Sequence, residues 1–212
     1  DVLIIGGGLA GCMAAIKAAE QPGVKVTLVD KSNTLASGCA AMGIDHLFAY
    51  IPPIHEKMGY TIEDMAEDHR QGTAFGMFRK DLFMLVAGAM YERVLDLERM
   101  GIQFRYEDSA APGKFRVVPQ FQSVPTSFNF DGRPLKTVLT KEARRRGVTI
   151  INRVQMTDLI AKDGQIAGAV GVGTRSADLY FFTAKSVVLS TGRSNRLSRN
   201  PSGIDFNTRL PA

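Results

Sequence analysis

The N-terminal end of the chain constrains the fold most, because a short apolar run leads directly into a glycine-rich turn. Residues 2–5 are β-formers, and the segment Gly6-Gly7-Gly8-Leu9-Ala10-Gly11 follows them with the spacing Gly-x-Gly-x-x-Gly. An alanine-rich stretch with helix-forming character comes next, and then a second β-forming run, residues 25–29, ends at Asp30. A strand, a glycine turn, a helix and a second strand in this order predict a βαβ unit with a parallel sheet.

The spacing of these residues predicts a site for an adenine dinucleotide. Gly6 would allow a tight turn out of the strand, Gly8 would let a pyrophosphate touch the backbone, and Gly11 would let the helix lie close to the sheet. The free N–H groups at the helix N-terminus favour an anion. Asp30 follows Gly11 by nineteen residues, where a carboxylate can accept hydrogen bonds from a ribose. The alternative is a glycine turn without a ligand, but the flanking elements favour the dinucleotide.

The composition is that of an ordinary soluble domain with a sizeable core, since 45% of the 212 residues are hydrophobic and 22% are charged. This length predicts one domain or slightly more. The formal net charge of +5 is compatible with an anionic partner, but the basic residues are scattered apart from two clusters. Residues 144–146 lie at a predicted helix C-terminus, where cations offset the helix dipole on a solvated face. The second cluster consists of Arg193, Arg196 and Arg199. No basic stripe alternates with aromatic residues, so no nucleic-acid partner is expected.

Cysteine content and hydropathy indicate the cellular compartment in which the chain is expected. Cys12 and Cys39 are too few for a disulfide framework or a four-cysteine metal site, so we predict no metal and a reducing, cytoplasmic compartment. Cys12 falls in the first turn of the predicted helix, where we expect a packed small side chain. No window approaches the roughly 18 apolar residues of a transmembrane segment. The chain begins on a strand without a signal peptide or an initiator methionine, which indicates a trimmed sequence.

Helices are predicted in the middle of the chain. Residues 31–48 are rich in small residues and lack periodicity, which suits backbone running close to a ligand, although a surface loop would look the same. Thr61 is a candidate cap for a short helix. A longer helix is predicted over residues 81–100 and stops at Gly101. Its apolar residues at helical spacing are Leu82, Leu85, Val86, Ala89, Met90, Val94 and Leu97, and its polar side consists of Glu92, Arg93, Asp96, Glu98 and Arg99. The core, rather than a cofactor pocket, is the predicted place of Met77, Phe78, Phe83 and Met84.

The second half of the chain is rich in β-forming runs. Residues 102–130 are expected to be irregular or extended, and Pro134 is expected to start a helix that closes at Gly147. Strands are predicted over residues 148–154, 158–161, 166–172, 179–183 and 186–190, with a hairpin turn at Asp163-Gly164. The last strand is expected to return to the parallel sheet beside the first, bringing Thr191-Gly192 near the glycine loop. The fold class is therefore α/β, a Rossmann-like domain with parallel sheet, helices and an inserted antiparallel β-meander.

Four blocks of this sequence resemble the large FAD-binding family that includes succinate dehydrogenase and fumarate reductase flavoprotein subunits, L-aspartate oxidase and the adenylylsulfate reductase α subunit. The blocks are residues 6–11, Asp30-Lys31 with Ser37-Gly38 and residues 41–43, residues 132–135, and residues 184–192. Residues 97–104 also look like a segment of this family. Together the blocks span nearly the whole chain in the right order, which is more specific than any one block.

The resemblance implies a cofactor, FAD, and a role for each matching residue. Gly6, Gly8 and Gly11, with Leu9 and Ala10 between them, would hold the pyrophosphate, and Asp30 would hold the adenosine ribose beside Lys31 and Ser32. The approach to the pyrophosphate and the flavin ring would be lined by Ser37, Gly38, Ala41 and Gly43. Val154 is expected at the end of the first meander strand and would meet adenine through its backbone. Thr191 and Gly192 would complete the site.

One departure from the family pattern concerns the flavin linkage. Several relatives carry a histidine in the block that here occupies residues 37–43, and that histidine links covalently to the flavin. This block has none, which resembles the non-covalent members and predicts non-covalent FAD. His46, three residues further on, is a minor candidate for a linkage or a proton donor. His55 and His69 are expected to be ordinary surface or neighbouring residues, and Cys39 a filler rather than a flavin contact.

The resemblance also sets the expected domain organisation and function. The whole chain, 1–212, would be an FAD-binding domain. Its parts would be the βαβ unit and flavin loop (1–48), a mostly helical insertion (49–147), the meander and return strand (148–192), and the start of a linker (193–212). The family's capping domain would be absent, and with it the catalytic residues, so these stay unknown.

The function implied is an FAD-dependent oxidoreductase that passes a hydride or an electron pair through flavin N5. The expected partners are a small-molecule substrate such as a dicarboxylate and an iron–sulfur electron-transfer subunit. The alternatives are an adenylylsulfate reductase α-like flavoprotein, an NAD-binding dehydrogenase domain and a non-catalytic binding module.

Overall fold

The computed structural model describes residues 1–72, 78–105, 114–118, 124–125 and 127–192. Its residues group into two compact units, one formed by Asp1–Gly43 with Arg133–Ala212 and the other by Ile44–Gly132. The predictions for Met77, for the second arginine cluster and for the linker at 193–212 lie outside the described residues.

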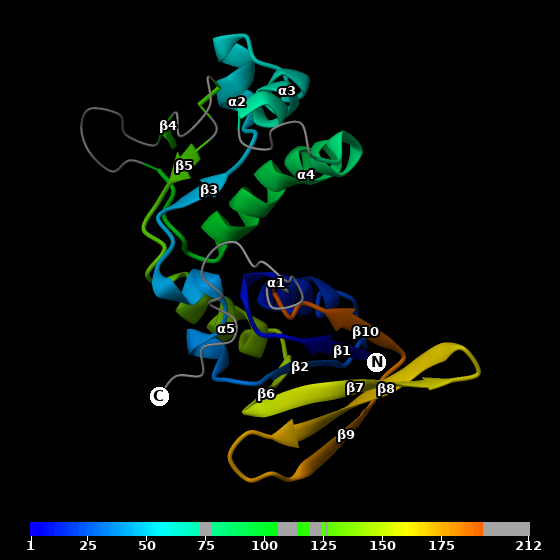
Figure 1. Cartoon of the computed structure of the whole chain (residues 1–212). Helices are drawn as coiled ribbons and strands as arrows, with labels where there is room; N and C mark the ends of the chain where they lie inside the picture. Colours follow the sequence, from blue (N-terminus) through cyan, green and yellow to red (C-terminus); the bar gives the residue numbers. More distant parts are fainter. Residues whose placement is uncertain (73–77, 106–113, 119–123, 126, 193–212) are drawn as a thin grey trace. The chain divides into compact units, whose positions relative to one another are not determined.

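A four-stranded parallel sheet forms the centre of the first unit (Figure 1). Its strands are β1 (Val2–Ile5), β2 (Val26–Asp30), β6 (Thr149–Asn152) and β10 (Ser186–Leu189), in the order β10-β1-β2-β6. Within it, Leu3 is aligned with Thr27 on one side and with Val187 on the other. The predicted βαβ unit and the return of the last strand beside the first are confirmed, and the carboxyl ends of all four strands share one edge.

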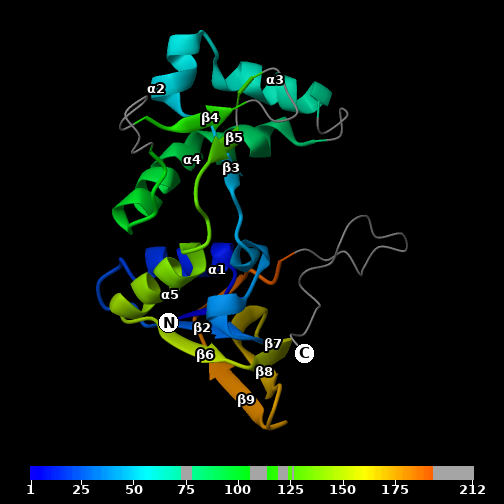
Figure 2. The same ribbon diagram turned by 90° about the vertical axis from the view of Figure 1, so that its left-hand side faces the viewer.

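Two helices cover one face of this sheet, and an antiparallel sheet covers the other (Figures 1 and 2). The helices are α1 (Leu9–Ala18) and α5 (Leu135–Arg145), which contact each other. The antiparallel sheet consists of β7 (Val154–Lys162), β8 (Gln165–Gly173) and β9 (Leu179–Thr183). Its inner face packs on the parallel sheet through a core of Leu3, Ile5, Val29, Val154 and Ala169. Burial of this apolar surface on both faces explains why the central strands read as continuous β-forming runs.

The predicted hairpin turn is confirmed, but the first meander strand was wrongly delimited. Asp163 and Gly164 both have positive φ, 53° and 74°, as a two-residue turn between antiparallel strands requires. The predicted strand 148–154 is two elements, because Arg153 adopts φ 66° between β6 and β7. β6 therefore belongs to the parallel sheet, and Val154 begins the meander rather than ending its first strand. The sequence pattern carries no sign of this turn because arginine rarely adopts positive φ.

Short 3₁₀ helices replace the featureless loop expected between β2 and the second unit. They are η1 (Thr34–Ala36) and η2 (Cys39–Met42), and both contact α5. The Asn33 side chain accepts a hydrogen bond from the Leu35 N–H at 3.0 Å and so caps η1. Local side-chain capping of this kind leaves no periodic signal in the sequence.

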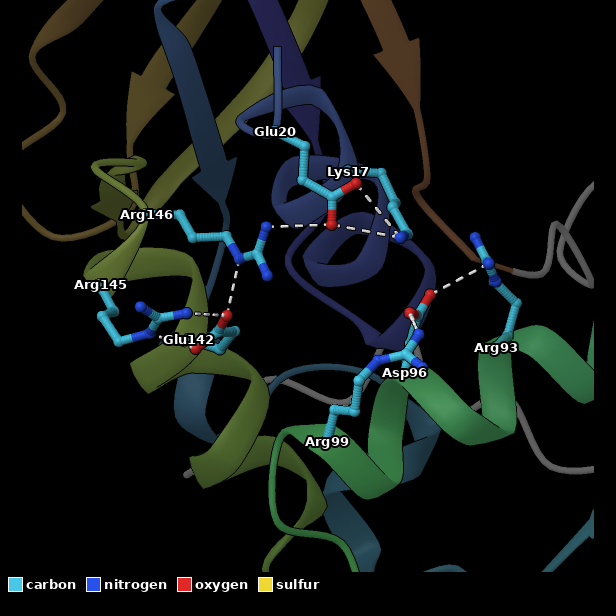
Figure 3. A network of polar contacts seen from close by, with 8 residues as sticks. All are labelled: Lys17, Glu20, Arg93, Asp96, Arg99, Glu142, Arg145 and Arg146. Carbon is cyan, nitrogen blue, oxygen red and sulfur yellow. Dashed lines mark hydrogen bonds and ion pairs between the residues drawn. The ribbon is translucent and has the colours of Figure 1, made fainter. Parts of the chain in front are cut away.

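Charged side chains connect α1 to the C-terminal end of α5 (Figure 3). Arg146 donates to Glu20, which follows α1, at 3.0 Å and to Glu142 at 2.6 Å. Glu142 also accepts a hydrogen bond from Arg145 at 2.7 Å, and Lys17 pairs with Glu20 at 3.2 Å. The basic cluster at residues 144–146 thus lies at the helix C-terminus, as predicted, and two of its three arginines are engaged in ion pairs.

The second unit combines helices with a small antiparallel sheet. Its helices are α2 (Pro52–His55), η3 (Glu56–Met58), α3 (Ile62–Gly72) and α4 (Lys80–Arg99), and its strands are β3 (His46–Phe48), β4 (Arg116–Val118) and β5 (Ser127–Asn129), in the order β3-β5-β4. Tyr50, Met65 and Ala87 form a buried cluster, against which Phe48 and Phe83 pack. Both predicted helices are confirmed, whereas three-residue strands are too short for a periodic signal.

The predicted faces of α4 are partly wrong. Leu82, Leu85 and Val86 are 51–72% exposed, although the periodicity placed them on the apolar face. Asp96, assigned to the polar side, is buried and forms ion pairs with Arg93 and Arg99 (Figure 3). An ion pair lets a carboxylate occupy a buried position that a pattern of hydrophobicity assigns to water.

Candidate dinucleotide site

Close backbone packing at the carboxyl end of β1 explains two glycines of the loop. Gly6 has φ +104°, and a Cβ there would lie 2.4 Å from the Ser190 carbonyl oxygen. A Cβ on Gly11 would lie 1.8 Å from the Gly6 carbonyl oxygen. Contacts this short exclude any side chain. Gly6 and Gly11 therefore bring β1, α1 and the residue after β10 together, as the motif predicts.

Gly8 is required for a different reason. Its φ of −67° suits any residue, and a Cβ there would meet only the Gly38 Cα, at the ordinary contact distance of 3.7 Å. Gly38 approaches from the opposite side, with φ +81°, and a Cβ on it would lie 2.8 Å from the Gly8 Cα. Two bare backbones thus face each other at the N-terminus of α1. Folding alone does not demand glycine at position 8, so space for a ligand is the reason that the geometry supports.

The facing backbones of Gly8 and Gly38, together with the N-terminus of α1, are called the cradle below. The Asp30 carboxylate holds together the loops around this cradle. Its Oδ2 accepts hydrogen bonds from the Gly7 N–H and from the Ser37 hydroxyl, both at 2.6 Å, and its Oδ1 accepts one from the Ser32 N–H at 2.7 Å. Asp30 is only 4% exposed. A carboxylate offers about four acceptor positions, so these three bonds leave room for one more donor. The sequence pattern indicates a ribose contact for Asp30 but not this second role, in which Asp30 holds the surrounding loops together.

Most of the other predicted residues also lie in the first unit around this edge of the sheet. Lys31 and Ser32 directly follow β2 and are half-buried, and Ser37 and Gly38 lie between η1 and η2. Ala41 is part of η2, and Gly43 ends it with φ +81°. The exposed pair Thr191 and Gly192 follows β10, where Ser190 donates a hydrogen bond to the Gly6 carbonyl at 3.0 Å. Leu9 and Ala10 form the first turn of α1. Val154 is buried at the start of β7 and contributes its side chain to the core.

Three residues around the site, Lys136, Thr34 and Asn152, were missed in the sequence. The Lys136 ammonium, on α5, donates hydrogen bonds to the Gly7 carbonyl at 2.5 Å and to the Cys12 sulfur at 3.1 Å. Thr34 donates from its N–H and from its hydroxyl to the Asn152 side-chain oxygen, at 2.9 and 2.7 Å. Lys136 shares the buried face of α5 with Leu139, Thr140 and Ala143. A lysine on the apolar face of a helix is a signal that could have been noticed.

The predictions for histidines and cysteines have mixed outcomes. Cys12 is fully buried as expected, and burial raises the pKa of its thiol. Cys39 is exposed. His55 is not a surface residue: it is fully buried, accepts the Ile51 N–H at Nδ1 (2.8 Å) and donates from Nε2 to the Pro125 carbonyl (3.0 Å).

The other two histidines differ in their surroundings. His46 is half-exposed, and its Nδ1 lies 2.6 Å from an Asp45 carboxylate oxygen. His69 stacks on Phe83 and contacts Phe48 and Phe78, and burial lowers its pKa. A minor role for His46 in flavin linkage or proton donation therefore stays a prediction.

The described residues were also considered as ligands for a metal ion and as membrane-spanning helices. Among the described residues, no group of three or more His, Cys, Asp or Glu side chains is arranged to hold a metal ion. In the same part of the chain, no helix has the length and apolar character needed to cross a membrane.

Comparisons with known proteins show which family the chain belongs to. Residues 1–211 match the family described as FAD binding domain. One subunit of the fumarate reductase (CoM/CoB) of Methanothermobacter marburgensis is 31% identical over 205 residues, which cover 93% of this chain and 36% of that protein. The 8-methylmenaquinol:fumarate reductase flavoprotein subunit of Wolinella succinogenes is 28% identical, with coverage of 97% and 33%. The solved adenylylsulfate reductase of Archaeoglobus fulgidus has a TM-score of 0.74 and 28% identity, covering 91% of this chain and 30% of that one.

The chain belongs to the FAD binding domain family, in the group that contains fumarate reductase flavoproteins and adenylylsulfate reductase α subunits. The resemblance stated from the sequence is thereby confirmed, and so are the fold class and the cofactor, FAD. The chain spans about a third of the length of the relatives it matches. The observed cradle fits FAD, because bare backbone, a helix N-terminus and a strand-terminal carboxylate suit the two phosphates and the ribose.

Proposed function

We propose that this chain binds FAD without a covalent link and that the complete protein is a flavoprotein oxidoreductase of the fumarate reductase and succinate dehydrogenase type. The observation that carries the proposal is the bare backbone of Gly8 and Gly38, which face each other at the N-terminus of α1. A match to the FAD binding domain along the chain favours FAD over NAD. Bound FAD would supply two-electron chemistry at flavin N5, and the protein would bind, orient and tune it.

Each group around the cradle has a part in this proposal. The N–H groups of Leu9 and Ala10 belong to the first turn of α1, which cannot pair them within the helix, so they suit the pyrophosphate. Asp30 would use its remaining acceptor position for the adenosine ribose, beside Lys31 and Ser32. The flavin side of the cofactor would lie along Ser37, Gly38, Ala41, Gly43, Thr191 and Gly192. The backbone of Val154 would meet adenine.

Non-covalent binding is supported by the residues that follow the cradle. The block from Ser37 to Gly43 contains no histidine, and Cys39 is its one potentially nucleophilic sulfur. His46, beyond the block, pairs with Asp45. We therefore expect acid precipitation of the purified protein to release the flavin into the supernatant. Flavin that stays in the pellet would contradict non-covalent binding and would make His46 the first position to examine.

The wider organisation and the reaction are part of the same proposal. Relatives about three times as long carry sequence beyond the part matched here. We propose that a capping domain follows residue 212, that it supplies the catalytic residues, and that the substrate is a dicarboxylate or a similar small molecule. An iron–sulfur subunit is the proposed electron partner and the cytoplasm the proposed compartment. The similarity to adenylylsulfate reductase makes a sulfur nucleotide the second candidate substrate.

The proposed FAD site is tested by a pair of glycine variants. Gly8→Ala adds a methyl group to the cradle without a backbone clash. We expect a urea midpoint close to that of wild type but at least about tenfold weaker FAD binding, measured by flavin fluorescence on cofactor-free protein. Gly11→Ala is the contrasting variant. Its methyl group would collide with the Gly6 carbonyl and destabilise the fold by about 1–3 kcal/mol, so its effect should appear in the urea midpoint. Wild-type protein that takes up no FAD, or unchanged binding by Gly8→Ala, would overturn the proposal.

A further inference from the structure

One peptide unit of the glycine loop is held from both sides by groups of opposite charge. The Gly7 N–H donates to the Asp30 carboxylate at 2.6 Å, and the Gly7 carbonyl accepts from the Lys136 ammonium at 2.5 Å. Asp30 ends β2 and Lys136 lies on α5, 129 residues beyond Gly7. Because charge-assisted hydrogen bonds are stronger and more directional than neutral ones, this arrangement fixes the orientation of the residue directly before Gly8.

The buried charge of Lys136 is unusual for a structural residue. Lys136 is only 3% exposed, and a buried ammonium is costly unless it is well partnered. Its contacts in the described part of the chain are a neutral carbonyl and the Cys12 sulfur. Burial raises the pKa of that thiol. The two contacts satisfy hydrogen bonds of the ammonium, but neither partner is a carboxylate.

We propose that Lys136 is a positioning residue for the dinucleotide: it locks the Gly7 peptide so that the backbone after it is ready for the pyrophosphate, and its positive charge favours that anion. This inference rests on the proposed FAD site. Lys136 acts from behind the loop, through Gly7, and so it differs from the motif glycines. The same bond connects α5, which comes late in the chain, to the N-terminal loop.

The proposal predicts which part of the cofactor is affected. Loss of Lys136 weakens binding of ligands that carry the pyrophosphate, whereas riboflavin, which has no phosphate, is unaffected. A merely structural lysine would instead lower stability and leave the affinity of the folded protein unchanged. Affinity for FAD and ADP, set against the urea midpoint without ligand, therefore separates the two roles.

The experiment compares Lys136→Met with wild type and with Lys141→Met, which removes an exposed lysine from the same helix. We expect Lys136→Met to bind FAD and ADP at least about tenfold more weakly, with riboflavin binding unchanged, and Lys141→Met to match wild type. Lys136→Arg, which keeps the charge and the donor, should recover part of the affinity. Binding of FAD by Lys136→Met within about threefold of wild type would overturn the proposal.

A replacement variant and a comparison with wild-type binding ensure that the experiment can still contradict the proposal. If Lys136→Met does not fold, Lys136→Gln replaces it, because its amide is neutral but still donates a hydrogen bond. A tenfold loss of FAD affinity in folded Lys136→Gln supports the proposal, and wild-type affinity overturns it. Failure of the proposed FAD site itself is distinguishable, because wild-type protein would then bind neither FAD nor ADP.

Discussion

Glycines of one motif are required for different physical reasons, and this difference is visible at single residues. Gly6 and Gly11 face backbone oxygens at distances that no side chain tolerates, so the fold itself requires them. Gly8 faces only the Gly38 Cα at 3.7 Å, so the fold would accept an alanine there. The motif therefore combines two positions that shape the loop with one that the fold does not require to be glycine, the position that we propose leaves space for the cofactor.

His55 is a second case in which a single residue organises backbone. Both ring nitrogens make hydrogen bonds to buried backbone groups, those of Ile51 and Pro125. We expect His55→Ala to lower the free energy of unfolding by about 2–4 kcal/mol, because it leaves a cavity and an unpaired N–H. Urea denaturation measures this loss. His46→Ala, at a half-exposed position, should change stability by less than about 0.5 kcal/mol, and equal losses in the two variants would contradict this role of His55.

At the scale of elements, α4 shows that two leucines on the same helix can contribute very differently to the free energy of unfolding. Leu97 is 5% exposed and Leu85 is 72% exposed on the same helix. We expect Leu97→Ala to destabilise the protein by about 2–5 kcal/mol, whereas Leu85→Ala should cost less than about 0.5 kcal/mol. Denaturant titration of both variants provides the comparison. A large loss at Leu85 would mean that its face of α4 is covered in solution.

The C-terminal end of α5 should contribute a pH-dependent part of stability. Hydrogen bonds from Arg145 and Arg146 lower the pKa of Glu142 from 4.5 to about 2. A carboxyl with a lowered pKa in the folded state contributes stability that is present above pH 4.5 and lost as the pH falls toward 2.

We expect Glu142→Gln to lower the free energy of unfolding by about 1 kcal/mol at pH 7, a modest amount because Arg145 is 70% exposed. The difference from wild type should shrink between pH 4.5 and pH 2, as measured by thermal unfolding across that range. A difference that stays constant down to pH 2 would show that the ion pairs of Glu142 are not its source.

On the scale of the whole molecule, the second unit is an insertion in the sequence of the first. The chain leaves the first unit after Gly43 and returns to it at Arg133. Gly43 and Arg133 bound the insertion, and a Cβ on Gly43 would lie 3.8 Å from the Arg133 side chain. Gly132 packs directly against the Ile44 carbonyl on the other side of the boundary. Chain ends that lie this close allow a domain to be inserted or removed.

We expect a chain in which residues 44–132 are replaced by a short glycine–serine linker to fold and to bind ADP. Cooperative urea unfolding followed by circular dichroism tests folding, and titration with ADP tests the site. The matched control is the same deletion carrying Gly8→Ala, which should fold but bind ADP more weakly. Loss of the cooperative transition in the deletion itself would show that the first unit depends on the second.

Local rules made much of this molecule predictable. The glycine spacing, the acid at the end of β2 and the Asp163-Gly164 turn each act within a few residues, so the sequence alone indicates the βαβ unit, the hairpin and their order. The order of the β-forming runs also indicated the return of β10 beside β1, and the family resemblance added the identity of the cofactor. The three short strands of the second unit and the break at Arg153 lack such a local signature.

The sequence by itself therefore determined the α/β class, the glycine loop and the residues that follow its strands. Only the tertiary structure decided which polar groups are buried, because burial depends on segments that meet from far apart in the chain. It placed Lys136 against Gly7, gave Asp30 three protein donors and put His55 inside the second unit. A charge or an imidazole looks the same in a sequence whether or not it finds its partners, and those partners decide whether it can leave water.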